Sequence, residues 1–208
     1  DVAASERYVA LNTQDEDADK YEPLELKHRP PVPATEFAAA LAGKIFAVEA
    51  DRQVVAHIYR QVLEDGYNGL VTLDYSRQDW RNEQMALLAN TLRQVSCPQV
   101  TTLDLSWNDM TVDGLELLGE AFALGALSGV RVLNLSNCTL LRALPEAFGH
   151  LVELEVLNLE NCVGMASLPK ALAGLVCLRE INIKKCHLLK PEEVVKELGL
   201  AKVVSLLV

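Results

Sequence analysis

The chain has 208 residues, half of them hydrophobic, so it is long enough for one domain with a large core and too apolar for a wholly disordered protein. Its net charge of −10 argues against a nucleic-acid partner, which would need a basic surface, and no apolar run is long enough to predict a transmembrane helix. The leucines are unevenly spread, because 31 of the 36 lie at or after residue 70. The main core is therefore expected in the last two-thirds of the chain.

Residues 1–34 are expected to form an acidic, proline-containing, extended tail. Residues 15–19 are an acidic run, residues 29–33 contain three prolines typical of a polyproline II stretch, and apolar periodicity is absent. Two interpretations stay open, a solvated linker or a segment that lies extended on a partner. Its apolar anchors on a partner would be Tyr8, Tyr21, Leu24 and Leu26.

Residues 35–69 are expected to form a helical N-terminal cap. The pattern predicts helices over residues 36–48 and 51–64, with Gly66 as the end of the second. The second helix carries an apolar stripe suited to covering the structure that follows. This stripe consists of Val54, Val55, Ile58, Val62 and Leu63.

Five segments after residue 69 share the pattern LxxLxLxx followed by Asn, Cys or Gln. They start at residues 70, 100, 130, 154 and 178, so consecutive copies are 30 or 24 residues apart, and residues 201–208 form a degenerate sixth copy. Regular copies of this kind indicate a stacked repeat array that buries its apolar residues between neighbours. The five segments are Leu70–Gln78, Val100–Asn108, Val130–Cys138, Leu154–Cys162 and Leu178–Cys186.

This repeat resembles the leucine-rich repeat family over residues 70–208. The resemblance implies an α/β solenoid with parallel strands on its concave face and helices and 3-10 turns on its convex face. The longer repeats, with helices capped by Asn82 and Thr111, resemble the ribonuclease-inhibitor-like subclass. The shorter ones read LPxxφxxL, with Pro145 and Pro169 in the first turn of short helices, and resemble repeats of plant immune receptors and Ras-scaffold proteins. A helix over Pro191–Leu198 and the last strand are expected to cap the C-terminal end.

We number the nine residues of the pattern as places one to nine. Places one, four and six are expected to be buried, and places three, five and seven to point outward, because side chains alternate along a strand. A side chain at place nine can form a hydrogen-bonded ladder along the solenoid. Cys138, Cys162 and Cys186 hold this place, and we interpret them as buried, reduced ladder residues rather than a metal or redox site, because their spacing equals the repeat period.

The concave face is the candidate binding surface. Its place-five column of Asp and Asn is either an adaptable hydrogen-bonding floor or a turn-favouring feature of the repeat, and its charge is expected to become basic toward Lys184 and Lys185. Trp107, at place eight, is either a binding hot spot or a residue packed on the neighbouring turn or the tail. The candidate partner-binding residues are Arg77, Asp104, Trp107, Arg131, Asn134, Asn158, Glu160, Arg179 and Lys184.

Catalytic chemistry is not indicated. The four histidines hold different places in the pattern, no nucleotide-binding, protease or esterase motif occurs, and no cysteine spacing suits a metal, so we expect neither an enzyme nor a cofactor. An odd number of cysteines, five, beside a large aliphatic core favours a reducing intracellular compartment. This would be the cytoplasm, or an organelle if the N-terminus is processed.

Two functions remain as hypotheses. The first is a non-catalytic protein–protein interaction module or scaffold that binds a protein partner through its concave face. The alternative is a constitutive subunit of a large multiprotein complex that contacts its neighbours through the N-terminal tail and the convex helices. The tail distinguishes them, because it would be ordered against other chains in a constitutive subunit and mobile in a free module.

Overall fold

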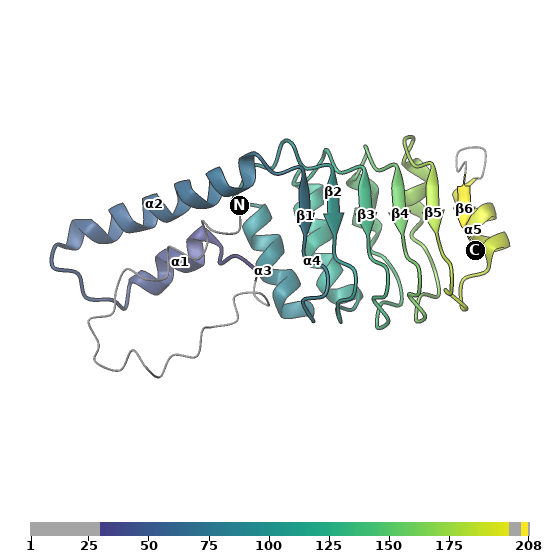
Figure 1. Cartoon of the computed structure of the whole chain (residues 1–208), viewed down its shortest axis with the longest axis horizontal. Coiled ribbons are helices and arrows are strands. Elements are labelled where there is room, and N and C mark those ends of the chain that lie inside the picture. Colours follow the sequence, from purple (N-terminus) through teal and green to yellow (C-terminus); the bar gives the residue numbers. More distant parts are fainter. Residues whose placement is uncertain (1–29, 200–204, 208) are drawn as a thin grey trace.

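The structure, a computed structural model, describes residues 30–199 and 205–207. Six short strands form one parallel sheet in chain order, as the repeat pattern predicts (Figure 1). The strands are β1 (Thr72–Asp74), β2 (Thr102–Asp104), β3 (Val132–Asn134), β4 (Val156–Asn158), β5 (Glu180–Asn182) and β6 (Ser205–Leu207). Their register aligns the place-four residues of the first five coils, so the five predicted repeats are confirmed. In β6, Leu206 pairs with the place-four residue Ile181, whereas a copy that starts at residue 201 makes Leu206 place six, so the predicted phase of the last copy is wrong by two residues.

Helices form the second layer, each following a strand. Neighbouring helices of this layer pack on each other along the solenoid, and α5 closes its C-terminal end by packing on the last 3-10 helix. The two proline residues of the short repeats lie directly before the 3-10 helices rather than in their first turn. The elements are α3 (Asn82–Leu92), α4 (Val112–Ala123), the 3-10 helices η4 (Glu146–His150) and η5 (Lys170–Gly174), and α5 (Pro191–Leu198).

The core lies between the sheet and this helical layer. Places one, four and six are buried in the inner coils, and Leu157 and Leu159 of the central coil are fully buried. Outward orientation holds for places three and five of most coils, but Ser106 and Ser136 at place seven are buried. The first coil differs because it has a neighbour on one side only, and its Leu70 is 39% exposed.

The ladder at place nine is present in four coils. Asn108 Nδ2 donates to the carbonyl of Tyr75, three residues before place nine of the preceding coil, at 2.9 Å. The cysteine thiols make the same contact, each donating to the place-six carbonyl of the coil before it. The donor–acceptor pairs are Cys138–Leu105 at 3.4 Å, Cys162–Leu135 at 3.0 Å and Cys186–Leu159 at 3.0 Å. All three are free, buried cysteines, as predicted for structural ladder residues.

An N-terminal hairpin of α1 (Ala34–Leu41) and α2 (Glu49–Asn68) projects beyond β1 (Figure 1). Phe37 stacks on Tyr59 between the two helices, with 3.8 Å between ring centroids. Only the last turns of α2 reach the solenoid, where the hydroxyls of Tyr67 and Tyr75 form a 2.8 Å hydrogen bond. Helix α2 therefore covers the first coil at its C-terminal end rather than along its length.

The predicted apolar stripe of α2 is divided by this geometry. Val55 and Leu63 are partly buried, whereas Val54, Ile58 and Val62 are 53%, 49% and 38% exposed. The reason is that most of α2 lies beyond the edge of the sheet, where no coil exists to be covered. Gly66 does not end the helix, which continues to Asn68.

The segment before α1 docks on α3. The Thr91 hydroxyl donates to the Pro31 carbonyl at 2.8 Å, and the Thr35 amide donates to Gln94 Oε1 at 3.1 Å. Pro30 and Pro33 are buried, so this end of the predicted tail is packed rather than solvated. The rest of the tail, residues 1–29, lies outside the described residues, including its acidic run and its apolar anchors.

Asn82 does not cap its own helix. Arg81 holds the N-cap position of α3, and Asn82 is the first helical residue. Asn82 instead accepts the Thr111 amide at 2.9 Å and donates to the Thr111 hydroxyl at 2.9 Å. Thr111 holds the N-cap position of α4, as predicted. The two longer coils are thus tied together at the starts of their helices.

Leu157→Ala tests the register. We expect the free energy of unfolding to fall by about 2–5 kcal/mol, because the substitution removes buried contacts and leaves a cavity in a coil packed on both sides. Val152→Ala, at a 54% exposed position, is the control and should change stability by less than about 0.5 kcal/mol. Urea melts of the two variants measure this, and equal losses would contradict the register.

Cys162→Ser tests the ladder through its pH dependence. Burial raises the pKa of the Cys162 thiol to about 12, above that of an unfolded cysteine. The protonated, buried thiol should therefore support the stability of the wild type up to about pH 8. By pH 10 the free energy of unfolding should fall by about 1–2 kcal/mol, because the unfolded thiol ionises first. The serine variant, about 1 kcal/mol less stable at pH 7, should approach the wild type at pH 10. Urea melts at both pH values decide, and an unchanged gap would refute a buried, protonated thiol.

Candidate protein-binding surface

The outward side of β1–β5, which we call the strand face, carries the predicted binding residues. At place five, a side-chain oxygen accepts the backbone N–H of place seven in the same coil. Asp104 and Ser106 make this contact at 2.9 Å, and Asn158 and Glu160 make it at 3.0 Å. Asn134 also donates across coils to Asp104, at 2.8 Å. The place-five column therefore closes the turn after each strand, and one acceptor of each side chain is already used.

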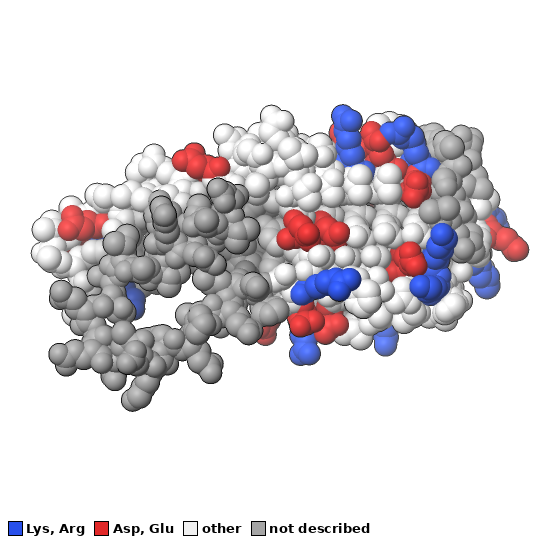
Figure 2. All heavy atoms as spheres, viewed as in Figure 1, with Lys and Arg blue, Asp and Glu red and all other residues white. Residues whose placement is uncertain are grey.

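The basic residues of the strand face are largely paired within the chain. Glu155 lies between Arg131, at 3.7 Å, and Arg179, and it forms ion pairs with both. Blue and red side chains adjoin one another over the later strands (Figure 2). The basic end predicted from the sequence is thus partly neutralised, because residues 24 apart lie side by side in adjacent coils.

A second ion pair joins place eight of the fifth coil to place seven of the fourth. Lys185 donates to Glu160 at 3.2 Å, and this hydrogen bond lowers the pKa of the Glu160 carboxyl. Asn182 also donates to Glu160, at 3.4 Å. Lys184 is exposed and makes no ion pair within the described part of the chain.

Place eight has a left-handed backbone in every coil from the first to the fifth. The φ angles lie between 56° and 61°, a conformation that asparagine tolerates better than other non-glycine residues. Asn137 and Asn161 suit it, whereas the three remaining residues are poorly suited. The full column is Arg77, Trp107, Asn137, Asn161 and Lys185.

Trp107 is the bulkiest residue of this column and is 49% exposed. The Arg77 guanidinium lies over its ring, 5.0 Å from the centroid. Packing on the neighbouring turn, one of the two predicted arrangements, is therefore present, but it covers only part of the ring. An exposed aromatic ring remains beside the Asp104–Asn134 pair of the adjacent place-five column.

The structure thus brings the nine predicted residues onto one face but divides them into two groups. Arg77, Asp104, Trp107 and Asn134 lie together on the first three coils. Arg131 lies on the third coil as well but pairs with Glu155 of the fourth coil. The members on the later coils are Asn158, Glu160, Arg179 and Lys184, and several of the second group are engaged in ion pairs or turns. The sequence signal for the left-handed turn is asparagine at place eight, as in Asn137 and Asn161. The apolar periodicity that identifies the repeats carries no information on backbone handedness.

Metal-binding clusters and reactive side chains bear on any catalytic chemistry of the described residues. No three His, Cys, Asp or Glu side chains within them are placed to hold a metal ion. Burial raises the pKa of Cys97 to about 11 and that of Tyr75 to about 12, and both are attached to the core. None of the helices in the described ranges is long and apolar enough to cross a membrane.

Comparisons with known proteins agree with the repeat pattern. Residues 129–151 match the family described as Leucine Rich Repeat. The leucine-rich repeat domain of the type III effector XCV3220 (XopL) is 17% identical, with 84% of this chain and 88% of that chain covered and a TM-score of 0.38. An internalin (inlF) from Listeria monocytogenes is 16% identical, with 74% and 52% covered and a TM-score of 0.31. No curated protein sequence matches the chain.

Both TM-scores lie below 0.5, so the assignment depends on features of the chain itself. These are the matched repeat, the in-register parallel strands and the place-nine ladder. The chain therefore has the fold of a leucine-rich repeat solenoid, and the family match covers one of its repeats, residues 129–151.

Proposed function

We propose that this chain is a non-catalytic interaction module that binds a protein partner through the strand face, with Trp107 as the central contact. Leucine-rich repeat domains generally mediate protein–protein interaction. The observation that carries the proposal is a half-exposed tryptophan held in a left-handed backbone conformation. Such a residue is costly for the isolated chain, and its exposed ring is of the type enriched at interface hot spots.

The surroundings of Trp107 support a central contact with a polar rim. Arg77 holds one side of the ring in place, which limits the side-chain entropy lost when a partner packs on the other side. Asp104, on the same coil as Trp107, and Asn134, on the next coil, are hydrogen-bonded to each other and supply fixed polar groups. The paired charges around Glu155 would orient a partner more than strengthen its binding.

Trp107→Asn tests this proposal on stability and binding together. Asparagine suits the left-handed turn, which offsets the loss of the exposed cation–π contact, so we expect the stability to change by no more than about 1 kcal/mol. Affinity for the partner should nevertheless fall by about 2 kcal/mol, or roughly 30-fold. Thermal melts measure the first quantity and calorimetric titration the second.

The partner is found by affinity capture with three baits: the wild type, Trp107→Asn and the control Leu124→Asn. Leu124 is 75% exposed at the end of α4, in the helical layer. Candidate partners are the proteins that the wild type and the control capture and Trp107→Asn does not. Their affinity for each variant is then measured by calorimetric titration. Equal capture by all three baits, or a large loss of stability in Trp107→Asn, would refute the strand face as the working surface.

One observation favours the alternative, a constitutive subunit of a large assembly. The projecting hairpin exposes a row of aliphatic residues along α2, and apolar rows of this kind mark contact surfaces. In that case the native chain should elute from size-exclusion chromatography of cell extract only in a high-mass fraction. Ile58→Glu should release it as a free species. A free pool of wild-type chain would contradict constitutive membership.

A further inference from the structure

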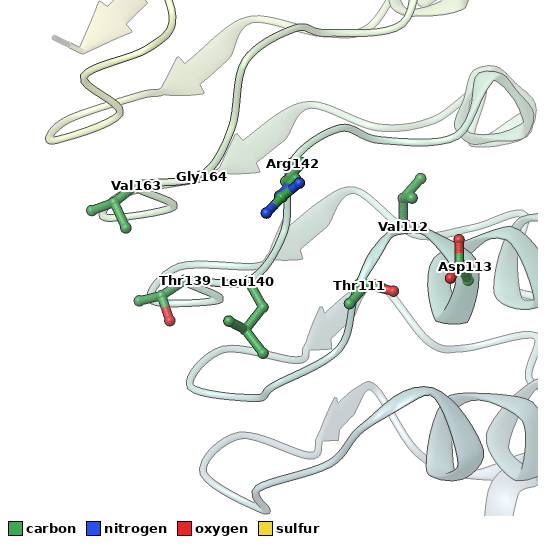
Figure 3. Close-up of a pocket in the computed structure, with 8 residues that line it drawn as sticks. All are labelled: Thr111, Val112, Asp113, Thr139, Leu140, Arg142, Val163 and Gly164. Carbon is green, nitrogen blue, oxygen red and sulfur yellow. The ribbon is translucent and has the colours of Figure 1, made fainter.

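A groove of about 450 Å³ lies at the edge of the solenoid, away from the strand face. It opens just beyond place nine, where the second, third and fourth coils turn toward the helical layer. Leu140 and Val163 form its outer wall, and Thr111 and Val112 stand opposite (Figure 3). No predicted binding residue lines it, so it is a second surface and its existence is independent of the proposed function.

The groove arises from the change of repeat type. After Asn108 the chain enters α4 at Val112, four residues later, whereas after Cys138 and Cys162 it runs eight residues before η4 and η5 begin. The long coil therefore turns inward early while the short coils continue as extended turns. The space between these two paths is the groove.

Arg142 is the cationic side chain of the groove. It is exposed and forms no ion pair with any carboxylate in the described ranges, in contrast to Arg131 and Arg179 on the strand face. Figure 3 shows its guanidinium directed between Leu140 and Val163 on one side and Thr111 on the other. An unpaired guanidinium beside apolar side chains is a favourable position for a carboxylate, because Arg can bind one bidentately.

Two further features define this position. A Cβ atom on Gly164 would lie 3.0 Å from the Thr139 carbonyl oxygen and 3.7 Å from Arg142 Cγ, so the glycine lets the two turns and the arginine stem pack closely. Leu140 and Val163 are 51% and 40% exposed, and they present aliphatic surface next to the guanidinium. The acidic residue of the lining, Asp113, lies in the first turn of α4, where the helix dipole offsets its charge.

We propose that this groove docks an extended segment of a protein partner that places a carboxylate side chain on Arg142 and an aliphatic side chain against Leu140 and Val163. The charge of Arg142 excludes a basic segment, and the two exposed aliphatic residues disfavour a wholly polar one. The order of the two features in the groove requires that the acidic and aliphatic residues of the partner be close neighbours in its sequence.

The test uses a displayed library of random heptapeptides selected on the full chain. We expect enriched peptides to carry Asp or Glu within two residues of Leu, Ile or Val. Replacing that acid by its amide in the best peptide should weaken binding at least ten-fold. Arg142→Gln should have the same effect, and Arg142→Lys should recover part of the affinity, because it keeps the charge but loses the planar fork.

Arg179→Gln is the matched control and should leave peptide binding unchanged, and thermal melts verify that Arg142→Gln remains folded. Trp107→Asn should also leave peptide binding unchanged. The groove proposal and the strand-face proposal can therefore fail independently of each other. The proposal is overturned if no peptide is enriched, if enriched peptides lack an acid, or if Arg142→Gln binds them as well as the wild type. The last arm repeats the peptide titration on a chain that lacks residues 1–29. Unchanged affinity supports a separate partner, whereas much tighter binding would overturn the proposal and identify the chain's own acidic tail as the occupant.

Discussion

Each coil of this protein is held to the next where its strand ends and its backbone turns away from the sheet. At that point the place-six carbonyls of Leu135 and Leu159 accept the backbone N–H of place nine in their own coil, and a carbonyl oxygen can accept a second hydrogen bond. The place-nine side chain of the following coil supplies a donor, by an amide in Asn108 and by a thiol in the three cysteines. Stacking of the coils in register lets each of these carbonyls accept a hydrogen bond from the next coil.

The two kinds of ladder residue differ in what they can do. Asn108 has both a donor and an acceptor, and its Oδ1 also accepts the amides of Gln78 and Trp80 from the preceding coil. A thiol donates one weak hydrogen bond but brings more apolar surface, which suits positions that are fully buried. The amide lies in the second coil and the thiols in the third, fourth and fifth, and all four side chains are buried.

The same turn shapes the proposed binding surface. Closing the strand end requires a left-handed residue at place eight, and that residue points away from the core. Asparagine would fill this role at least cost in every coil, yet the second coil holds a tryptophan, and an arginine from the first coil packs on it. Trp107 thus combines an unfavourable left-handed backbone with an exposed aromatic side chain. A residue that costs stability without filling the core supports a role in binding.

Regular features of the fold could be predicted from the sequence because they depend on local alternation and on the spacing of copies. The register, the buried places and the cysteine ladder follow from these two facts, as Leu157 and Cys162 illustrate. The place-two column of Arg131, Glu155 and Arg179 was also visible, but the sequence could not show that its charges pair with each other. That pairing depends on the separation of adjacent coils and on the reach of long side chains across it.

The sequence by itself therefore determined a stacked array with a defined core, because every copy repeats the same local choice between inside and outside. Only the tertiary structure decided where the array departs from this regularity. The hairpin projects because α2 is longer than the edge it can cover, and α2 packs on the core through Leu63 and Tyr67 in its last turns. The groove beside Arg142 exists because two repeat types diverge in space at the same edge. Both features depend on distances between segments far apart in the chain, and no local pattern of residues reports such distances.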